Sequence, residues 1–162
     1  MALSFRGGIH PEYYKDYTFA SPIEKLKPTD IYIYPLSQHI GAMCEPLVSI
    51  GQRVTIGQKI ADSTAFVSAP IHASVSGIVK AIEPRYTANG YKVMSIVIEN
   101  DFKEEVCKEL INIPAKPLDE LNSEEIIKIA RDAGLVGMGG AAFPTCVKMK
   151  TAIDKKIKNT IK

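Results

Sequence analysis

Short apolar stretches alternate with turn residues through the first two thirds of the chain. Two clear examples are Ile31–Tyr34, which runs into Pro35, and Val93–Ile98. Turn signals recur roughly every 8–12 residues with no helical period between them, a pattern typical of a small β-sandwich or barrel. We therefore expect a mainly β domain over residues 30–100.

Two further strands and a hairpin are expected inside this domain. Residues 46–50 and 78–82 are β-rich, and the second of these strands should end near Pro84. Ala88-Asn89-Gly90 predicts a hairpin turn before the last strand.

The apolar period becomes helical after residue 118. Asn122 can cap a helix, and the carboxylates of Glu124 and Glu125 suit its first turn. Gly134 is well placed to end the helix. Four apolar residues at i, i+3, i+4 and i+7 predict its buried stripe: Ile126, Ile129, Ala130 and Ala133.

This change of pattern divides the chain into four parts. Residues 1–29 are predicted to form an extended arm, 30–100 the β domain, 101–118 a connector, and 119–162 part of a second domain. The arm carries an aromatic cluster that should dock it onto a neighbouring surface, formed by Tyr13, Tyr14, Tyr17 and Phe19.

The last segment, from Met149 to Lys162, is basic. Ile153, Ile157 and Ile161 recur at i, i+4 and i+8, which fits a short amphipathic helix or the start of a strand. We expect the lysines of this segment to form a solvated face, with an anion-binding patch as the alternative.

Composition excludes several classes of protein. The chain has 162 residues, of which 46% are hydrophobic, and its net charge of +2 is too small for a nucleic-acid binder. No run of 18 apolar residues occurs, so no membrane-spanning segment is expected. The N-terminus lacks the apolar stretch of a signal peptide, which favours the cytoplasm. Cys44, Cys107 and Cys146 match neither a disulfide framework nor a zinc site, and no metal ligands are predicted.

The stretch from residue 137 to residue 148 is the main candidate for chemistry. Its glycines let a ligand approach the backbone closely, and they are Gly137, Gly139 and Gly140. The face of Phe143 can stack on a ring, and Pro144 is pre-set to begin a helix on which Lys148 lies one turn further. A glycine loop before a helix can bind phosphate. The spacing fits neither the dinucleotide fingerprint nor a P-loop, so a plain turn stays open as the alternative.

A second spacing lies in the β domain. Valines and glycines recur at intervals of three between Val48 and Gly57, and Ser76-Gly77 follows Pro70. This spacing resembles the biotinyl/lipoyl-carrier type of barrel-sandwich hybrid, in which a hairpin presents a modified lysine. The matching hairpin, residues 65–68, contains no lysine. The resemblance therefore supports the fold and speaks against a carrier.

Longer motifs indicate a narrower family. The glycine loop is similar to the flavin and NADH loop of the flavoprotein subunit of respiratory complex I. Together with stretches 7–11, 35–41 and 66–77, it resembles the C-subunit family of the Rnf electron-transport complexes. These complexes are ion-pumping ferredoxin:NAD oxidoreductases of bacteria. The resemblance runs from Gly7 to about Lys150.

This resemblance implies a peripheral electron-transfer subunit on the cytoplasmic face of the membrane. Its barrel-sandwich hybrid would be followed by an α/β domain that binds FMN and NAD(H), and then by a domain with 4Fe-4S clusters. Three residues would lie along the flavin and its phosphate: Gly137, Gly139 and Gly140. Lys148 would supply positive charge to the phosphate or the flavin ring, and Phe143 would face the nicotinamide nucleotide. NADH and the other subunits would be the partners.

Two departures from the family matter. Ala142 stands where the family usually has glycine, which is tolerable unless this residue needs a positive φ. The remaining flavin residues and the iron–sulfur ligands are expected beyond Lys162, so the chain resembles an N-terminal fragment that should lack activity alone. We also expect the region beyond residue 118 to pack loosely, because its apolar stripe has lost its partners.

Other candidate residues have mainly structural interpretations. His39 and His72 should cap turns or bond backbone carbonyls, with a subunit interface or an electron path as the alternative. His10 and Cys44 could bind metal only with partners that the sequence does not reveal. For the chain as a whole, a non-catalytic docking module of the complex is the second hypothesis.

Overall fold

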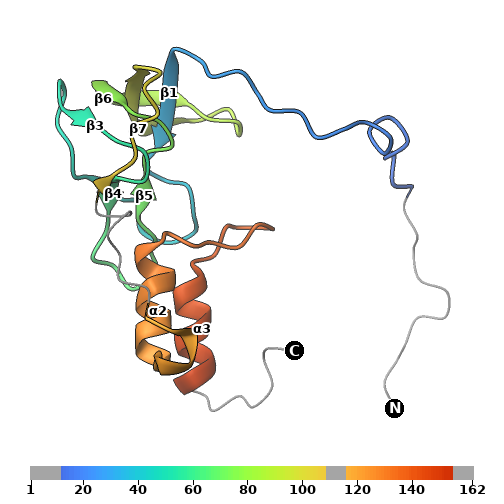
Figure 1. Ribbon diagram of the computed structural model, residues 1–162, viewed down its shortest axis with the longest axis vertical. Helices are drawn as coiled ribbons and strands as arrows, with labels where there is room; N and C mark the ends of the chain where they lie inside the picture. The colour runs from blue at the N-terminus through green and yellow to red at the C-terminus, as the bar shows by residue number, and fades with distance from the viewer. Residues whose placement is uncertain (1–11, 109–115, 155–162) are drawn as a thin grey trace.

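The structure, a computed structural model, describes residues 12–108 and 116–154. The strands are β1 (Ile31–Pro35), β2 (Glu45–Pro46), β3 (Arg53–Val54), β4 (Lys59–Asp62), β5 (Ile71–His72), β6 (Gly77–Tyr86) and β7 (Lys92–Asn100). They are followed by the 3-10 helix η1 (Leu118–Glu120) and the helices α2 (Ser123–Asp132) and α3 (Thr145–Asp154). Figure 1 shows the strands gathered in one body, with α2 and α3 side by side at one end of it.

The strands form two antiparallel sheets around a shared core. One sheet has the order β1-β7-β6-β3 and the other β2-β4-β5. The most deeply buried large side chains come from both sheets and their connections: Leu36, Val54, Ile60, Val79, Ile96 and Ile98. Burying each such side chain stabilises the fold by about 1.5–3 kcal/mol. The arrangement agrees with the mainly β barrel-sandwich that the sequence predicts.

The hairpin between β6 and β7 has the predicted turn but a longer first strand. Thr87 N–H donates to Tyr91 O (2.9 Å), and Gly90 has a φ of +82°. The strand does not end near Pro84 as expected but continues to Tyr86. Hydrogen-bonded and non-hydrogen-bonded pairs alternate along an antiparallel ladder. Thr87 and Tyr91 form a hydrogen-bonded pair, so Pro84 and Met94, three positions further along, form a non-hydrogen-bonded pair, and the Pro84 nitrogen points away from β7. The N–H that proline lacks therefore costs no ladder bond.

The strand expected at residues 46–50 is wrong beyond Pro46. β2 has only two residues, because the chain then crosses from one sheet to the other. Gly51 completes the crossing with a φ of +85°, and its N–H donates to Val79 O in β6 (2.7 Å).

The two ends of α2 are those that the sequence predicts. Asn122 Oδ1 accepts from the Glu125 N–H (2.9 Å), and the Glu125 carboxylate accepts from the Asn122 N–H (2.8 Å). These reciprocal bonds complete a capping box. Gly134 follows the helix with a φ of +67°, as a C-terminal glycine should.

The buried face of α2 differs from the predicted stripe. Ile127 and Ala130 are buried, whereas Ile129 is 54% exposed and Ala133 is exposed as well. The predicted stripe is therefore wrong for Ile129 and Ala133. The face toward the barrel includes Arg131, and a charged residue is invisible to a search for apolar periodicity.

The helix pair packs against itself and against the barrel. Its buried contacts join Ile127, Ala130, Cys146 and Val147, with Val67, Phe143 and Met149 partly buried around them. Val67 belongs to the barrel segment between β4 and β5, so the apolar contact continues into the β domain. The expectation of loose packing beyond residue 118 is therefore wrong for α2 and α3, because the barrel supplies a partner surface.

The arm extends away from the barrel over residues 12–28 (Figure 1). Its large apolar side chains are 74% to 102% exposed, and they are Tyr13, Tyr14, Tyr17, Phe19, Ile23 and Leu26. The predicted docking surface is therefore not this chain's own barrel.

Some expectations lie outside the described residues. They are those on the motif at residues 7–11 with His10, and on Ile157 and Ile161 near the C-terminus. Within the ranges 12–108 and 116–154, no helix combines the length and apolar character needed to cross a bilayer.

Candidate functional site

The candidate loop begins where α2 ends against the barrel. Gly134 N–H donates to Arg131 O (3.0 Å) and Leu135 N–H donates to Ala130 O (3.2 Å). These two bonds make a Schellman ending, which needs a left-handed residue. A Cβ added to Gly134 would also lie 2.5 Å from Pro70 O. Glycine is thus the residue that lets the helix end so close to the β domain.

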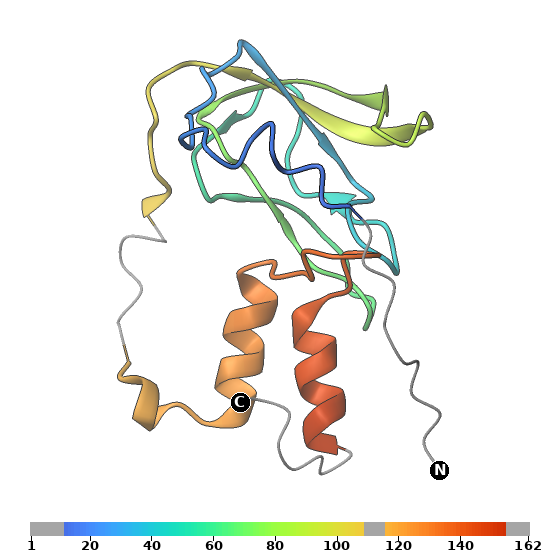
Figure 2. The same cartoon turned by 90° about the vertical axis from the view of Figure 1, so that its right-hand side faces the viewer.

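Two backbone hydrogen bonds close the base of the loop. Gly137 N–H donates to Phe143 O and Thr145 N–H donates to Leu135 O, each at 2.9 Å. The predicted helix is present as α3, but it starts at Thr145, one residue after Pro144, which pairs with Val136 in an isolated β-bridge. Because Leu135 already accepts the first N–H of α3, this donor is not free for a phosphate. Figure 2 shows the loop at the ends of both helices that face the barrel.

The tip of the loop is open. Met138 is fully exposed, and a Cβ added to Gly139 or Gly140 would meet no atom within 4 Å. Gly140 has a φ of +63° and Ala142 a φ of +50°. Residue 142 therefore has the positive φ at which an alanine in place of the family's glycine is unfavourable. A left-handed backbone costs an alanine roughly 1–2 kcal/mol.

Three of the five predicted binding residues lie close together. The Lys148 ammonium is 5.7 Å from the centroid of the Phe143 ring, and a Cβ added to Gly137 would lie 3.5 Å from that ammonium. This places a cation and an aromatic face at the base of the loop. Gly139 and Gly140 are not part of this group, because they lie at the open tip.

A polar cluster led by Arg131 joins the helix pair to the barrel. Its Nη2 donates to Asp62 Oδ1 (2.6 Å), Ser63 O (2.8 Å) and Ser68 Oγ (3.3 Å). Lys59 also donates to Asp62 (3.2 Å). Burial alone would raise the pKa of the Asp62 carboxyl, but the hydrogen bonds from Arg131, the Ser63 N–H and Lys59 outweigh it and lower the pKa. Asp62 is therefore a carboxylate that keeps its charge as an anchor for α2.

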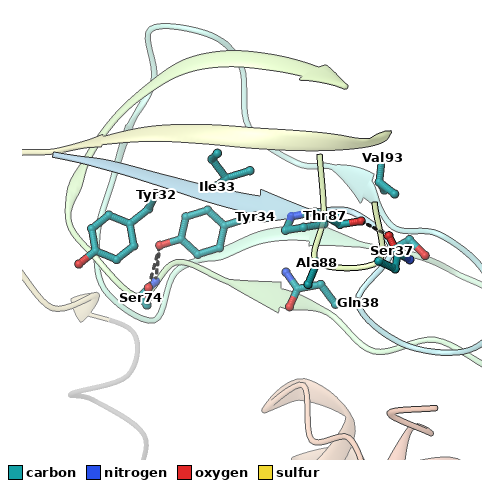
Figure 3. A pocket seen from close by; sticks show the side chains of 11 residues that line it. Tyr32, Ile33, Tyr34, Ser37, Gln38, Ser74, Thr87, Ala88 and Val93 are labelled. Carbon is teal, nitrogen blue, oxygen red and sulfur yellow. Dashed lines mark hydrogen bonds between the residues drawn. The ribbon is translucent and has the colours of Figure 1, made fainter. Parts of the chain in front are cut away.

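Two hollows on the barrel share part of their lining. The smaller, about 330 Å³, has these lining residues: Tyr34, Gln38, His39, Ala69, Pro70, Ile71, His72, Ser74, Gly134 and Val136. The larger, about 610 Å³, lies between β1 and the β6–β7 hairpin (Figure 3). Tyr34 and Ser74 line both, and their hydroxyl oxygens are 2.8 Å apart. None of the five predicted binding residues lines either hollow.

The two histidines of the barrel differ in their surroundings. His39 is buried, its Nε2 accepts the Ala69 N–H (3.1 Å), and its Nδ1 therefore carries the proton and donates to Ile40 O (3.0 Å). The predicted structural role of His39 is confirmed. Burial and then the nearby Lys59 ammonium lower the pKa of His72, so this imidazole favours the neutral form.

The cysteines do not fit an iron–sulfur cluster. Cys44 and Cys146 are buried in two separate apolar clusters, and Cys107 belongs to neither. Burial raises the pKa of the Cys44 thiol, and Asp62 adds to this, so the thiol stays protonated and donates to Ala69 O (3.2 Å). Among residues 12–108 and 116–154, no three His, Cys, Asp or Glu side chains are grouped as metal ligands.

Comparison with known families decides the assignment. The family described as the RnfC barrel sandwich hybrid domain matches residues 3–103, which is the arm and the whole two-sheet body. The chain belongs to the RnfC family. Membership confirms the resemblance that the sequence motifs indicate, and it confirms the barrel-sandwich fold.

Several RnfC relatives match nearly the whole chain. The chain is 46% identical over 159 residues to the C subunit of the proton-translocating ferredoxin:NAD(+) oxidoreductase complex of Clostridium ljungdahlii, covering 97% of the chain and 34% of that protein. It is 44% identical over 154 residues to the Na(+)-translocating counterpart of Acetobacterium woodii, covering 95% and 34%. The C subunit of the ion-translocating oxidoreductase complex of Rhodobacter capsulatus is 39% identical over 150 residues, covering 91% and 28%. The chain thus spans about a third or less of the length of these relatives.

Sequence reasoning missed the Arg131 cluster. Asp62 and Arg131 are 69 positions apart, and neither belongs to a recognisable motif. The predicted stripe did not include Ile127, the buried residue one turn before Arg131, so apolar periodicity gave no signal for this cluster.

Replacing Ala142 with glycine should stabilise the protein. Glycine relieves the left-handed strain at this residue but loses more backbone entropy on folding, so we expect a net gain of about 0.5–1 kcal/mol in the free energy of unfolding. Urea denaturation measures it. Ala141→Gly is the matched control, because Ala141 has no positive φ, and there glycine should lower stability by about 0.5–1 kcal/mol. Equal effects of the two substitutions would contradict the assigned backbone at Ala142.

Proposed function

We propose that this chain supplies one wall of an FMN and NAD(H) site in a membrane-associated electron-transfer subunit. The whole protein would move electrons between NAD(H), FMN and 4Fe-4S clusters within an ion-pumping ferredoxin:NAD oxidoreductase. It would lie peripherally on the cytoplasmic face of the membrane, with the other subunits as partners. The names of the RnfC relatives support the reaction class.

The observation that carries the proposal is the grouping at the base of the glycine loop. The Lys148 ammonium lies over the Phe143 ring and beside Gly137. A cation next to closely approachable backbone suits a phosphate, and an aromatic face suits a planar ring. The space around Gly139 and Gly140 leaves their backbone accessible to a ligand.

In this arrangement the residues present fit a flavin nucleotide. Lys148 would hold the phosphate or the electron-rich part of the flavin, the glycines would lie along it, and Phe143 would face the nicotinamide nucleotide. FMN would supply the hydride and single-electron chemistry, while the protein orients it. The described cysteines do not fit a 4Fe-4S cluster, so iron–sulfur clusters stay a prediction for the whole protein. Because only one wall is present, we expect the chain alone to bind flavin weakly and to lack activity.

Two lysines of α3 provide a matched test of the flavin site. Lys148 lies over Phe143 and Lys150 lies over Phe66, each at 5.7 Å from the ring centroid, so both make a similar cation–π contact. Lys148→Gln should weaken FMN binding about tenfold because it removes a charge-assisted bond to phosphate. Lys150→Gln should leave FMN affinity unchanged. Flavin fluorescence titration of this chain, and of a chain extended to the relatives' length, measures both.

A further variant separates ligand contact from folding. Gly139 has ordinary φ and open space, so Gly139→Val should fold normally yet obstruct the flavin. Equal effects of the two lysine variants, unchanged affinity in Gly139→Val, or no FMN or NADH binding by the extended chain would each contradict the site.

The second candidate function is that of an assembly module, and the arm favours it. Six large apolar side chains of residues 12–28 are exposed and touch no core of this chain. Three lysines balance three acidic residues there, so electrostatic attraction to an anionic lipid surface is not expected. Pro22 and Pro28 limit the conformations of the arm and lower the entropy lost on binding. A groove on another protein subunit fits these properties best.

Removing arm anchors should weaken assembly without affecting the fold. Replacing Tyr17 and Phe19 with serine should reduce retention of the other subunits at least about tenfold when the complex is purified through this protein, because buried aromatic anchors dominate interfaces. Melting temperature should not change, since both side chains are exposed. Lys25→Ser is the control. Undiminished retention in the double variant would remove the arm from the interface.

A further inference from the structure

A barrel loop reaches the glycine loop directly. Residues 36–44 join β1 to β2, and Ile40 in this loop donates its N–H to Ala141 O (3.0 Å). The Ala141 carbonyl belongs to the peptide plane whose nitrogen is that of Ala142. Holding that carbonyl therefore restricts the rotation that defines φ of Ala142, which is +50°.

His39 fixes the backbone at Ile40. Its Nδ1–H donates to Ile40 O (3.0 Å), and its Nε2 accepts from Ala69 N–H (3.1 Å). The ring thus bridges the barrel loop and the segment just before β5. The Cys44 thiol donates to Ala69 O (3.2 Å) on the same side. Since His39 is buried, water has little access to compete for these bonds.

Gly41 sets how closely the barrel loop approaches that segment. It has a φ of +115°, and a Cβ added to it would overlap Val67 O. The neighbouring Ala42 N–H donates to the same oxygen (3.1 Å). Val67 in turn packs on the apolar cluster of the helix pair, and Phe143 of the glycine loop packs on the same cluster. The barrel segment that holds the barrel loop therefore also contacts the helix pair that carries the glycine loop.

We propose that His39, Ile40 and Gly41 are positioning residues that impose the conformation of the glycine loop. The barrel would then determine the backbone conformation of the glycine loop through these contacts, in addition to packing beside it. The strained φ of Ala142 persists because the Ile40–Ala141 hydrogen bond and the closed base of the loop over-determine it. The consequence for cofactor binding rests on the proposed function, whereas the conformation of the loop does not.

Amide hydrogen exchange in Gly41→Ala tests the proposal without any ligand. The Ile40 amide reports the contact itself, and the Gly137 amide, bonded to Phe143 O, reports whether the base of the loop stays closed. We expect both amides to exchange at least about tenfold faster in the variant than in the wild type. The Val79 amide, bonded to Gln52 O inside the barrel, should change by less than about twofold and so shows that the barrel is intact.

Gly90→Ala is the matched control. Gly90 also has a positive φ (+82°), but it has open space and lies in the β6–β7 turn. The Gly90→Ala substitution should introduce similar backbone strain and leave the exchange rates of the Ile40 and Gly137 amides unchanged. If Gly41→Ala accelerates Ile40 but not Gly137, the loop keeps its shape without the barrel and the proposal is overturned. Faster exchange of the Val79 amide as well would mean that Gly41→Ala disturbs the barrel itself. In that case His39→Gln, which removes the imidazole N–H that donates to Ile40 O, replaces Gly41→Ala in the same comparison.

A double-mutant comparison tests the same coupling through stability. In the wild type, Ala142→Gly should raise the melting temperature by roughly 1–4 °C. In the Gly41→Ala background the loop can relax, so the same substitution should raise it by less than about half as much. Fully additive shifts would overturn the proposal. Neither hydrogen exchange nor the melting comparison involves flavin. The proposed coupling of the two loops can therefore hold even if FMN does not bind, and FMN binding can hold even if the coupling is absent.

Discussion

The set of hydrogen bonds from the Arg131 guanidinium to Asp62 at the end of β4, and to Ser63 and Ser68 after it, is the contact on which the rest of the arrangement depends. One nitrogen donates to a carboxylate, a carbonyl and a hydroxyl of the barrel, so the last turn of α2 is tied to the barrel at three acceptors. The Schellman ending at Gly134 follows three residues later and delivers the chain into the glycine loop. A charged group with several acceptors in a partly buried site is directional, whereas the apolar cluster around Ile127 is not.

In the resemblance to biotinyl and lipoyl carriers, residues 65–68 would be the hairpin that presents a lysine. Here it has no lysine, and its residues face the helix pair. Ser68 accepts from Arg131, Val67 packs on the apolar cluster of the helix pair, and the Phe66 ring lies under Lys150. These contacts join the segment to the helix pair that follows the barrel in the chain.

The sequence predicted local features better than long-range ones. The β-rich body, the hairpin turn at Gly90, the Asn122 cap and the Gly134 ending all depend on neighbours in the chain, and all are confirmed. The exposed Ile129 shows the limit, because apolar periodicity cannot register that Arg131 faces the barrel. Loose packing of the helices was expected because their apolar stripe was thought to have lost its partners, whereas the partner surface lies about 60 residues earlier in the chain. For the candidate site, the motif was enough to select the glycines and Lys148. It could not predict that Gly137 and Lys148 lie together at the base of the loop while Gly139 and Gly140 lie at its open tip.

The barrel and the helix pair should therefore fold as one unit through Arg131. Urea titration followed by amide NMR tests this with two reporters, Ala133 bonded to Ile129 O in α2 and Val79 bonded to Gln52 O in the barrel. We predict that both signals of the wild type disappear at one urea concentration, and that in Arg131→Met the Ala133 signal disappears first. Loss of the Ala133 signal well before Val79 in the wild type, or unchanged coincidence in Arg131→Met, would contradict a single folding unit held by this residue.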